Sequence, residues 1–244
     1  FRRVLFRSEG NGIIAEPTGP NGGMTAWIPT QGPHSVRNDL APLLGLEPDQ
    51  LRVATHAVGG GFGPKTGVYT EHIITMVLAR TLGRPVKWTE TRSEDMVALG
   101  HGRAQVQHVR FGVTRDGRFT GLSANVIGEA GAYPVVGSFL PFFTQAMSSG
   151  VYAIPKIEFN WQAVLTNTTQ VAAYRGAGRP EATELLERII DMAAAEIGMD
   201  PAELRRRNFL APAAFPFMPP TGAGFVYDTG EDRKSTRLNS SHRT

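Results

Sequence analysis

The chain has 244 residues, of which 41% are hydrophobic and 19% charged, a composition typical of a globular protein with one sizeable core or two small ones. It has no cysteine, which excludes disulfides, thiolate metal sites and cysteine-ligated iron–sulfur clusters within this sequence. The formal net charge of +3 would favour an acidic partner such as a nucleic acid, but the two ends of the chain carry this excess of basic residues.

The two ends of the chain have related coding sequences. One codon choice for residues 232–239 has a reverse complement that, read one base in, encodes the first residues of the chain. This inverted repeat resembles a translated sequencing-library adapter, so residues 1–8 and 232–244 are interpreted as artefacts. Residues 9–231 are then expected to be an internal piece of one native domain. Without the tails, 18 basic and 21 acidic residues remain, and we drop the nucleic-acid interpretation.

The first half of this segment predicts a strand at residues 24–28, a helix at 34–45 that Pro42 should kink or interrupt, and a strand at 51–58. The glycine-rich stretch VGGGFGPKTG begins where this last strand ends. A second helix should end at Gly83, before a strand at 85–90. Its apolar face is expected to consist of Ile73, Ile74, Val77 and Leu78.

The second half predicts a β-hairpin, since apolar residues alternate at 109–113 and 122–126 on either side of a tight Arg-Asp-Gly turn. Residues 157–165 alternate again and predict a strand. A helix from Pro180 to Ile197 follows, and then another with Asp200 as N-cap and Glu203 completing a capping box. Strands and helices are mixed without strict alternation, so we expect an α+β (mixed α/β) fold without a membrane span.

The glycine-rich stretch fails two familiar tests. A P-loop requires glycine before its lysine, and Pro64 precedes Lys65. A dinucleotide fingerprint requires a third glycine where this chain has Pro64 or Thr66. A tight turn explains any single glycine, but four glycines around Phe62 favour backbone amides that lie against a ligand beside an aromatic wall.

Two further stretches lie directly before predicted helices. AYRGAGRPEA places Arg175 and Arg179 around two glycines, where free amides and the helix dipole attract anions, although a loop with solvated arginines is the plainer alternative. WIPTQGPH ends a strand with Gln31, a residue that means little by itself. The combination of all three junctions, two of them rich in glycine and none with a catalytic dyad, favours a shared ligand-binding region.

As a set, TQGPH, VGGGFGPKTG and AYRGAGRPEA resemble the molybdenum-binding large subunit of the xanthine dehydrogenase and aldehyde oxidase family, in particular subunits of the carbon monoxide dehydrogenase type. LGRPVKWTETRSE, EAGAYP and LLERIIDMAAAEIGMDPAELRRRNF extend the resemblance over nearly the whole native segment. The resemblance implies that residues 9–231 are the first part of a molybdenum cofactor-binding domain.

The resemblance also implies site residues. Gln31, which would hydrogen-bond the oxo group on molybdenum, Phe62 and Arg175 are the expected catalytic residues. No protein ligand to the metal is expected, because the dithiolene sulfurs of the pterin hold the molybdenum. Cofactor contacts are expected from Gln31, Gly60, Gly61, Phe62, Gly63, Tyr174, Arg175, Gly176, Ala177 and Gly178.

Two departures from the family's patterns bear on the substrate. Members that act on purines have a glutamate where this chain has Thr66, and carbon monoxide enzymes have a copper-binding cysteine where it has Gly176. We therefore expect neither xanthine nor carbon monoxide as the substrate. An aldehyde and an aromatic N-heterocycle both remain open.

The resemblance implies oxidative hydroxylation with water as the oxygen source. Molybdenum-molybdopterin, in its cytosine dinucleotide form, would pass electrons to an iron–sulfur small subunit and an FAD-binding medium subunit, within a cytoplasmic dimer of heterotrimers. The family's catalytic glutamate belongs to a later region, so the chain alone is expected to be inactive and poorly folded. A non-redox nucleotide-binding module and a degenerate structural subunit are the alternatives.

Overall fold

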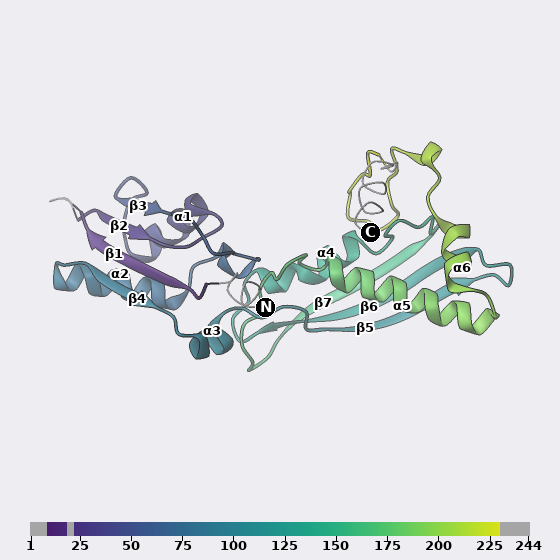
Figure 1. Cartoon of the computed structure of the whole chain (residues 1–244), viewed down its shortest axis with the longest axis horizontal. Coiled ribbons are helices and arrows are strands. Elements are labelled where there is room, and N and C mark those ends of the chain that lie inside the picture. The colour runs from purple at the N-terminus through teal and green to yellow at the C-terminus, as the bar shows by residue number, and fades with distance from the viewer. Residues whose placement is uncertain (1–8, 19–21, 230–244) are drawn as a thin grey trace, which may run out of the picture. The chain divides into compact units, whose positions relative to one another are not determined.

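The structure is a computed structural model that describes residues 9–18 and 22–229, and the tails interpreted as artefacts lie outside these residues. The chain divides into two compact units (Figure 1). The first unit comprises the chain up to Gly102 together with Ala130–Gly137 and Leu165–Arg175. The second unit comprises Arg103–Glu129, Ser138–Val164 and the chain from Gly176 onwards.

The first unit contains a four-stranded sheet in the order β3-β2-β1-β4. Strand β1 is antiparallel to both β2 and β4, whereas β2 and β3 are parallel, with Trp27 opposite Ala54. The strands are β1 (Gly12–Pro17), β2 (Met24–Trp27), β3 (Leu51–Ala54) and β4 (Val86–Thr89). The helices are α1 (Pro33–Leu43), the short 3-10 helix η1 (Pro64–Thr66), α2 (Thr70–Leu82) and α3 (Arg92–Ala98).

One face of this sheet carries the core of the first unit. Alternate strand residues point to that face, and both α1 and α2 pack against it. The buried cluster includes Ile13, Ala15, Met24, Ala26, Leu51, Val36, Leu40, Met76 and Ala79. The two helices thus cover one face of the sheet. The loops that follow the strands are not covered by this packing and can contact one another.

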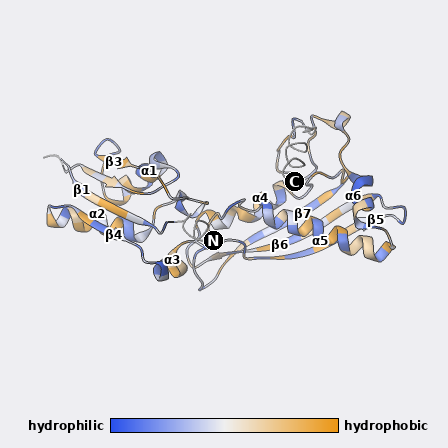
Figure 2. Cartoon of the chain, viewed as in Figure 1, coloured by the Kyte–Doolittle hydropathy of each residue, from blue (hydrophilic) through white to orange (hydrophobic). Residues whose placement is uncertain are grey.

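The predicted apolar face of α2 is wrong for three of its four residues, and only Ile73 packs against the core. Ile74, Val77 and Leu78 are exposed, and the buried face consists of His72, Thr75, Met76 and Ala79. Figure 2 shows hydrophobic and hydrophilic residues together along this helix. The apolar pattern misleads because the two polar residues are buried with partners: His72 bonds Asn11, and the Thr75 hydroxyl bonds the Glu71 carbonyl.

Other boundaries in the first unit also differ from the prediction. Strand β3 ends at Ala54, four residues earlier than expected, and β1 and α3 were not predicted. Pro42 lies in the last turn of α1, which ends at Leu43. The helix therefore ends near the proline, where an interruption was expected. Strands β3 and β4 do not pair, because β2 and β1 lie between them.

The second unit contains a three-stranded sheet in the order β5-β6-β7. Strands β5 and β6 are antiparallel with an irregularity at Gly112/Val113, which confirms the predicted hairpin. The strands are β5 (Gln105–Val113), β6 (Phe119–Gly131) and β7 (Ile157–Leu165). Besides the 3-10 helices η2 (Val136–Phe139) and η3 (Pro212–Ala214), the helices are α4 (Leu140–Ala146), α5 (Arg179–Ile197) and α6 (Pro201–Asn208).

Helix α5 supplies the core of the second unit with Leu185, Leu186 and Ile190, whose helical spacing predicted a buried face, and with Ala194. These residues pack with residues from all three strands and with Leu204 of α6. Asp200 caps α6 by accepting a 2.8 Å hydrogen bond from the Glu203 N–H. The predicted capping box is incomplete, because the Glu203 carboxylate binds Arg207 instead, at 2.9 Å.

The mixed α/β class predicted from the sequence is confirmed. Over residues 9–18 and 22–229, no helix has the length and apolar character that crossing a membrane requires.

Candidate functional site

The fold brings Gln31 against the glycine-rich loop. Gln31 follows β2, and the loop follows β3. Because these neighbouring strands are parallel, the segments that leave their carboxyl ends emerge at one edge of the sheet. The backbone N–H of Gln31 donates to the Lys65 carbonyl at 2.9 Å. Its side-chain Oε1 accepts from the Gly63 N–H at 2.7 Å.

This second bond fixes the orientation of the Gln31 amide. Since Oε1 faces the Gly63 N–H, the Nε2 group occupies the other side of the amide plane. None of the residues at 9–18 and 22–229 accepts a hydrogen bond from Nε2, and Gln31 itself is exposed. The Nε2 donor group of Gln31 therefore points away from Gly63 and has no acceptor among the residues that the structure describes.

Close packing explains two of the loop glycines. A Cβ atom on Gly61 would lie 2.3 Å from Cγ of Gln31. A Cβ atom on Gly63 would lie 2.1 Å from the Ala173 carbonyl oxygen, and Gly63 has a φ of +105°. Both approaches require the bare backbone that only glycine offers.

The third stretch meets the same loop. The backbone N–H of Arg175 donates to the Phe62 carbonyl at 2.9 Å, and the Arg175 guanidinium lies 5.9 Å from the centre of the Phe62 ring. Phe62 has a φ of +53°, a left-handed conformation that is costly for a non-glycine residue. Tyr174, the preceding residue, is exposed. The first unit thus gathers seven predicted site residues, namely Gln31, Gly60, Gly61, Phe62, Gly63, Tyr174 and Arg175.

The other three predicted residues belong to the second unit. Gly176, Ala177 and Gly178 have φ values of +100°, +43° and +83°, and Gly178 is the N-cap of α5. No described residue accepts a hydrogen bond from their three backbone N–H groups. The Gly178 carbonyl accepts from the Thr144 hydroxyl at 3.2 Å, which ties the turn to α4. Consecutive free amides at a helix start suit an anionic group.

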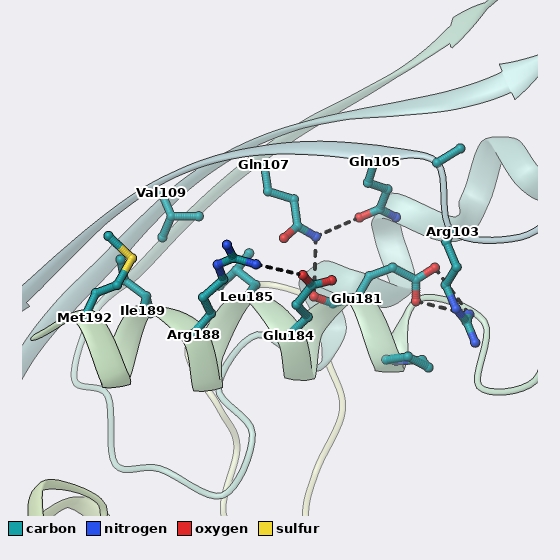
Figure 3. Close-up of a pocket in the computed structure, with 12 residues that line it drawn as sticks. Arg103, Gln105, Gln107, Val109, Glu181, Glu184, Leu185, Arg188, Ile189 and Met192 are labelled. Carbon is teal, nitrogen blue, oxygen red and sulfur yellow. Dashed lines mark hydrogen bonds and ion pairs between the residues drawn. The ribbon is translucent and has the colours of Figure 1, made fainter. Parts of the chain in front are cut away.

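One groove of the described residues has none of the predicted site residues in its lining. It has a volume of about 820 Å³ and lies between β5 and α5 in the second unit (Figure 3). Glu181 is buried in it and pairs with Arg103 at 3.4 Å, while Glu184 pairs with Arg188 in solvent. Glu181 lies in the first turn of α5, where an acidic side chain also complements the helix dipole.

A buried histidine lies beneath the start of α2. His72 Nε2 is 3.1 Å from Asn11 Oδ1, and Nδ1 accepts from the Tyr69 N–H at 3.2 Å. Burial disfavours the charged imidazolium and lowers the pKa of His72 to about 4. The ring is therefore neutral and structural. Over residues 9–18 and 22–229, no group of three or more histidine, aspartate or glutamate side chains could hold a metal ion.

Sequence reasoning missed Glu9. Its carboxylate accepts a hydrogen bond from Gly59, 50 residues later, and pairs with Lys65, whose side chain is 3% exposed. No local pattern announces such a contact, because it depends on how β1 pairs within the sheet. Thr66 also stabilises the glycine-rich loop, because its hydroxyl donates to the Gly63 carbonyl at 2.8 Å.

The chain belongs to the molybdopterin cofactor-binding domain family, which matches residues 3–209. It is 34% identical over 224 residues to the carbon monoxide dehydrogenase large chain of Hydrogenophaga pseudoflava, a match that covers 90% of this chain and 28% of the relative. It is 35% identical over 216 residues to the 6-hydroxypseudooxynicotine dehydrogenase complex subunit gamma of Paenarthrobacter nicotinovorans, covering 86% of this chain and 27% of that protein.

Among solved structures, quinoline 2-oxidoreductase from Pseudomonas putida 86 matches with a TM-score of 0.86 and 31% identity. That match covers 96% of this chain and 30% of the solved chain. The predicted family is confirmed, and the chain spans less than a third of the length of these relatives.

The residues present fit a molybdopterin cofactor. A neutral amide donor at Gln31 suits an oxo acceptor, and the unpaired amides of Gly176–Gly178 suit phosphate oxygens.

Proposed function

We propose that this chain is the first part of the large subunit of a molybdenum hydroxylase. In this role Gln31 donates through Nε2 to the oxo group of the cofactor, and Phe62 and Arg175 lie beside the metal centre. The observation that carries the proposal is the Gly63–Gln31 hydrogen bond, because it leaves the Gln31 donor group available. When bound, the molybdenum cofactor supplies the redox chemistry, with water as the oxygen source.

The protein's own contribution is to position and to bind. The left-handed Phe62 and the stacked Arg175 form a fixed wall, and a preorganised donor stabilises developing charge without reorganisation at the moment of reaction. We propose that Gly60, Gly61, Gly63 and Tyr174 contact the cofactor. We also propose that Gly176, Ala177 and Gly178 bind its phosphates.

The proposed substrate is an aldehyde or an aromatic N-heterocycle. Thr66 stands where purine-hydroxylating members of the family have a glutamate, and its hydroxyl is engaged with Gly63. Gly176 provides no thiolate for a copper ion. Two relatives are named for N-heterocyclic substrates, quinoline 2-oxidoreductase and nicotine 6-hydroxylase, and one is named aldehyde oxidoreductase.

We further propose that electrons leave to an iron–sulfur small subunit and an FAD-binding medium subunit, in a cytoplasmic dimer of heterotrimers that uses the cytosine dinucleotide form of the cofactor. The subunit designations of two relatives, one a complex subunit gamma and one a large subunit, support an assembly of several chains.

The test is to express the full-length protein that contains this chain together with its neighbouring subunits, and to measure bound molybdenum and substrate-dependent reduction of an artificial electron acceptor. Benzaldehyde and quinoline would serve as the two substrate probes. Gln31→Ala should lower the rate with either probe, while Gln162→Ala, an exposed glutamine on β7, should not.

Stoichiometric molybdenum with oxidation of at least one probe would support the proposal. A folded assembly that binds no molybdenum would overturn it, and a protein that binds free nucleotides without molybdenum would favour a nucleotide-binding module instead. A loaded but inactive assembly would favour a structural subunit.

A further inference from the structure

One carboxylate oxygen joins the two ends of the glycine-rich loop. Oε1 of Glu9 accepts a hydrogen bond of 2.9 Å from the backbone N–H of Gly59, where the loop begins. The same atom lies 3.0 Å from Nζ of Lys65, where the loop ends. The loop between these residues contains Gly61, Phe62 and Gly63.

Glu9 is held in place from behind. Two residues further on, the Asn11 N–H donates to the Glu90 carboxylate at 2.6 Å, and the Asn11 side chain bonds the buried ring of His72. The Glu90 N–H returns a bond to the Asn11 carbonyl at 3.0 Å. The backbone next to Glu9 is therefore fixed to α2 and to the end of β4. This anchoring positions the Glu9 side chain independently of its contacts with the loop.

Lys65 transmits this anchor to the site. Its side chain is 3% exposed, so its ammonium group depends on Glu9 for a counter-charge. Its carbonyl accepts bonds from the Gln31 N–H at 2.9 Å and from the Thr30 hydroxyl at 3.0 Å. One residue thus bonds Glu9 through its side chain and Gln31 through its backbone.

We propose that Glu9 is a positioning residue of the site. Through Gly59 and Lys65 it sets the loop that carries Phe62 and Gly63, and through the Lys65 carbonyl it sets the register of Gln31. The proposal rests on the proposed function for its catalytic consequence, but the ordering of the loop is a property of this chain alone. Nothing in the roles proposed for Gln31, Phe62 and Arg175 requires an acid at position 9.

The experiment compares Glu9→Gln with Glu16→Gln in the full-length assembly. Glu16 lies on β1, and among the described residues it makes no hydrogen bond to the loop. Hydrogen exchange of peptides that span residues 58–66, measured by mass spectrometry in the cofactor-free protein, should be about tenfold faster for Glu9→Gln only. In the loaded protein, the rate constant of reduction by substrate should fall about tenfold, with unchanged substrate affinity and unchanged molybdenum content.

A double-mutant cycle with Lys65→Met tests the proposed route. The effects of Glu9→Gln and Lys65→Met on loop exchange should be less than additive, because both substitutions remove the same ion pair. If Glu9→Gln does not fold, Glu9→Asp replaces it. The aspartate keeps the charge, but its side chain is one methylene shorter and does not bring an oxygen to both the Gly59 N–H and the Lys65 ammonium group.

Exchange equal to that of Glu16→Gln in a folded position-9 variant, or fully additive effects in the cycle, would overturn the proposal. Because exchange is measured without cofactor, it decides on Glu9 even if the assembly binds no molybdenum and the proposed function fails. A reduction rate that stays unchanged despite faster exchange would overturn the catalytic part.

Discussion

Gln31 and Gly63 are 32 residues apart in the chain, and a 2.7 Å hydrogen bond joins the side-chain carbonyl of one to the backbone N–H of the other. A Cβ atom on Gly61 would collide with the Gln31 side chain, so at position 61 the loop can approach Gln31 this closely only as bare backbone. A Cβ atom on Gly63 would collide with the Ala173 carbonyl on another side of the loop. The relationship orders a loop and orients an amide at the same time. These two effects can be separated by substitution.

Gln31→Glu keeps an acceptor oxygen for Gly63 and removes the Nε2 donor. Loop order should persist, whereas the rate of substrate-dependent reduction should fall by about 10² to 10³, the usual effect of losing one preorganised donor. Stopped-flow reduction measures the rate, and hydrogen exchange at residues 58–66 measures the loop. A variant with wild-type rates would remove Gln31 from the catalytic residues.

Gly63→Ala should destabilise the first unit. The new Cβ atom would lie 2.1 Å from the Ala173 carbonyl oxygen, at a φ of +105°, so the free energy of unfolding should fall by about 2 kcal/mol or more. Gly67→Ala is the matched control, because a Cβ atom there meets nothing within 4 Å at a φ of −116°. It should change stability by less than about 0.5 kcal/mol. Urea unfolding of both variants measures the contrast, and equal stabilities would contradict it.

His72 should make the stability of the first unit depend on pH. Burial lowers the pKa of His72 to about 4 in the folded protein, from its ordinary value of 6.5 in an unfolded chain. The unfolded chain therefore binds the proton more readily. The stabilisation is complete above pH 6.5 and is lost as the pH falls towards 4, by roughly 3 kcal/mol in all. Unfolding free energies measured at several pH values should show this slope. The slope should be smaller in His72→Gln, and identical slopes would show that other groups are responsible.

Two glutamates on α5 should behave differently. Glu181 is 6% exposed and pairs with Arg103, whereas Glu184 and its partner Arg188 are both mostly exposed. Glu181→Gln should lower the free energy of unfolding by about 1 to 3 kcal/mol, a range reduced because Arg103 is partly in solvent. Glu184→Gln should cost no more than about 0.5 kcal/mol. Thermal unfolding of the two variants gives the comparison, and a larger loss for Glu184→Gln would reverse the interpretation.

Local patterns predicted the hairpin and α5 well, because their information lies within neighbouring residues. The alternation in β5 and β6 and the spacing of Leu185, Leu186 and Ile190 each describe a single buried face. Strand β1 and the order of the first sheet depend on pairing between distant segments, which no local period records. On α2, counting only apolar residues found Ile73 but missed the rest of the buried face, because the buried His72 satisfies its polar atoms with Asn11 and Tyr69.

The roles expected of the site residues stay predictions. The motif resemblance selected Gln31, Phe62 and Arg175, and the fold places all three in the first unit with direct contacts through the glycine-rich loop. The sequence did not reveal which amide atom of Gln31 stays available. Nor did it indicate Glu9, whose importance follows from a contact across 50 residues.

The crowding between Gly61 and Gln31 also constrains how this protein can diverge. A side chain at position 61 would need the space that Cγ of Gln31 occupies, 2.3 Å from the Cβ position. Natural variants should therefore replace Gly61 and Gln31 together or keep both. Glu9 and Lys65 should also be replaced together, because each is the ion-pair partner of the other. Covariation of these pairs across an alignment of relatives would show that close packing of the loop prevents independent substitution.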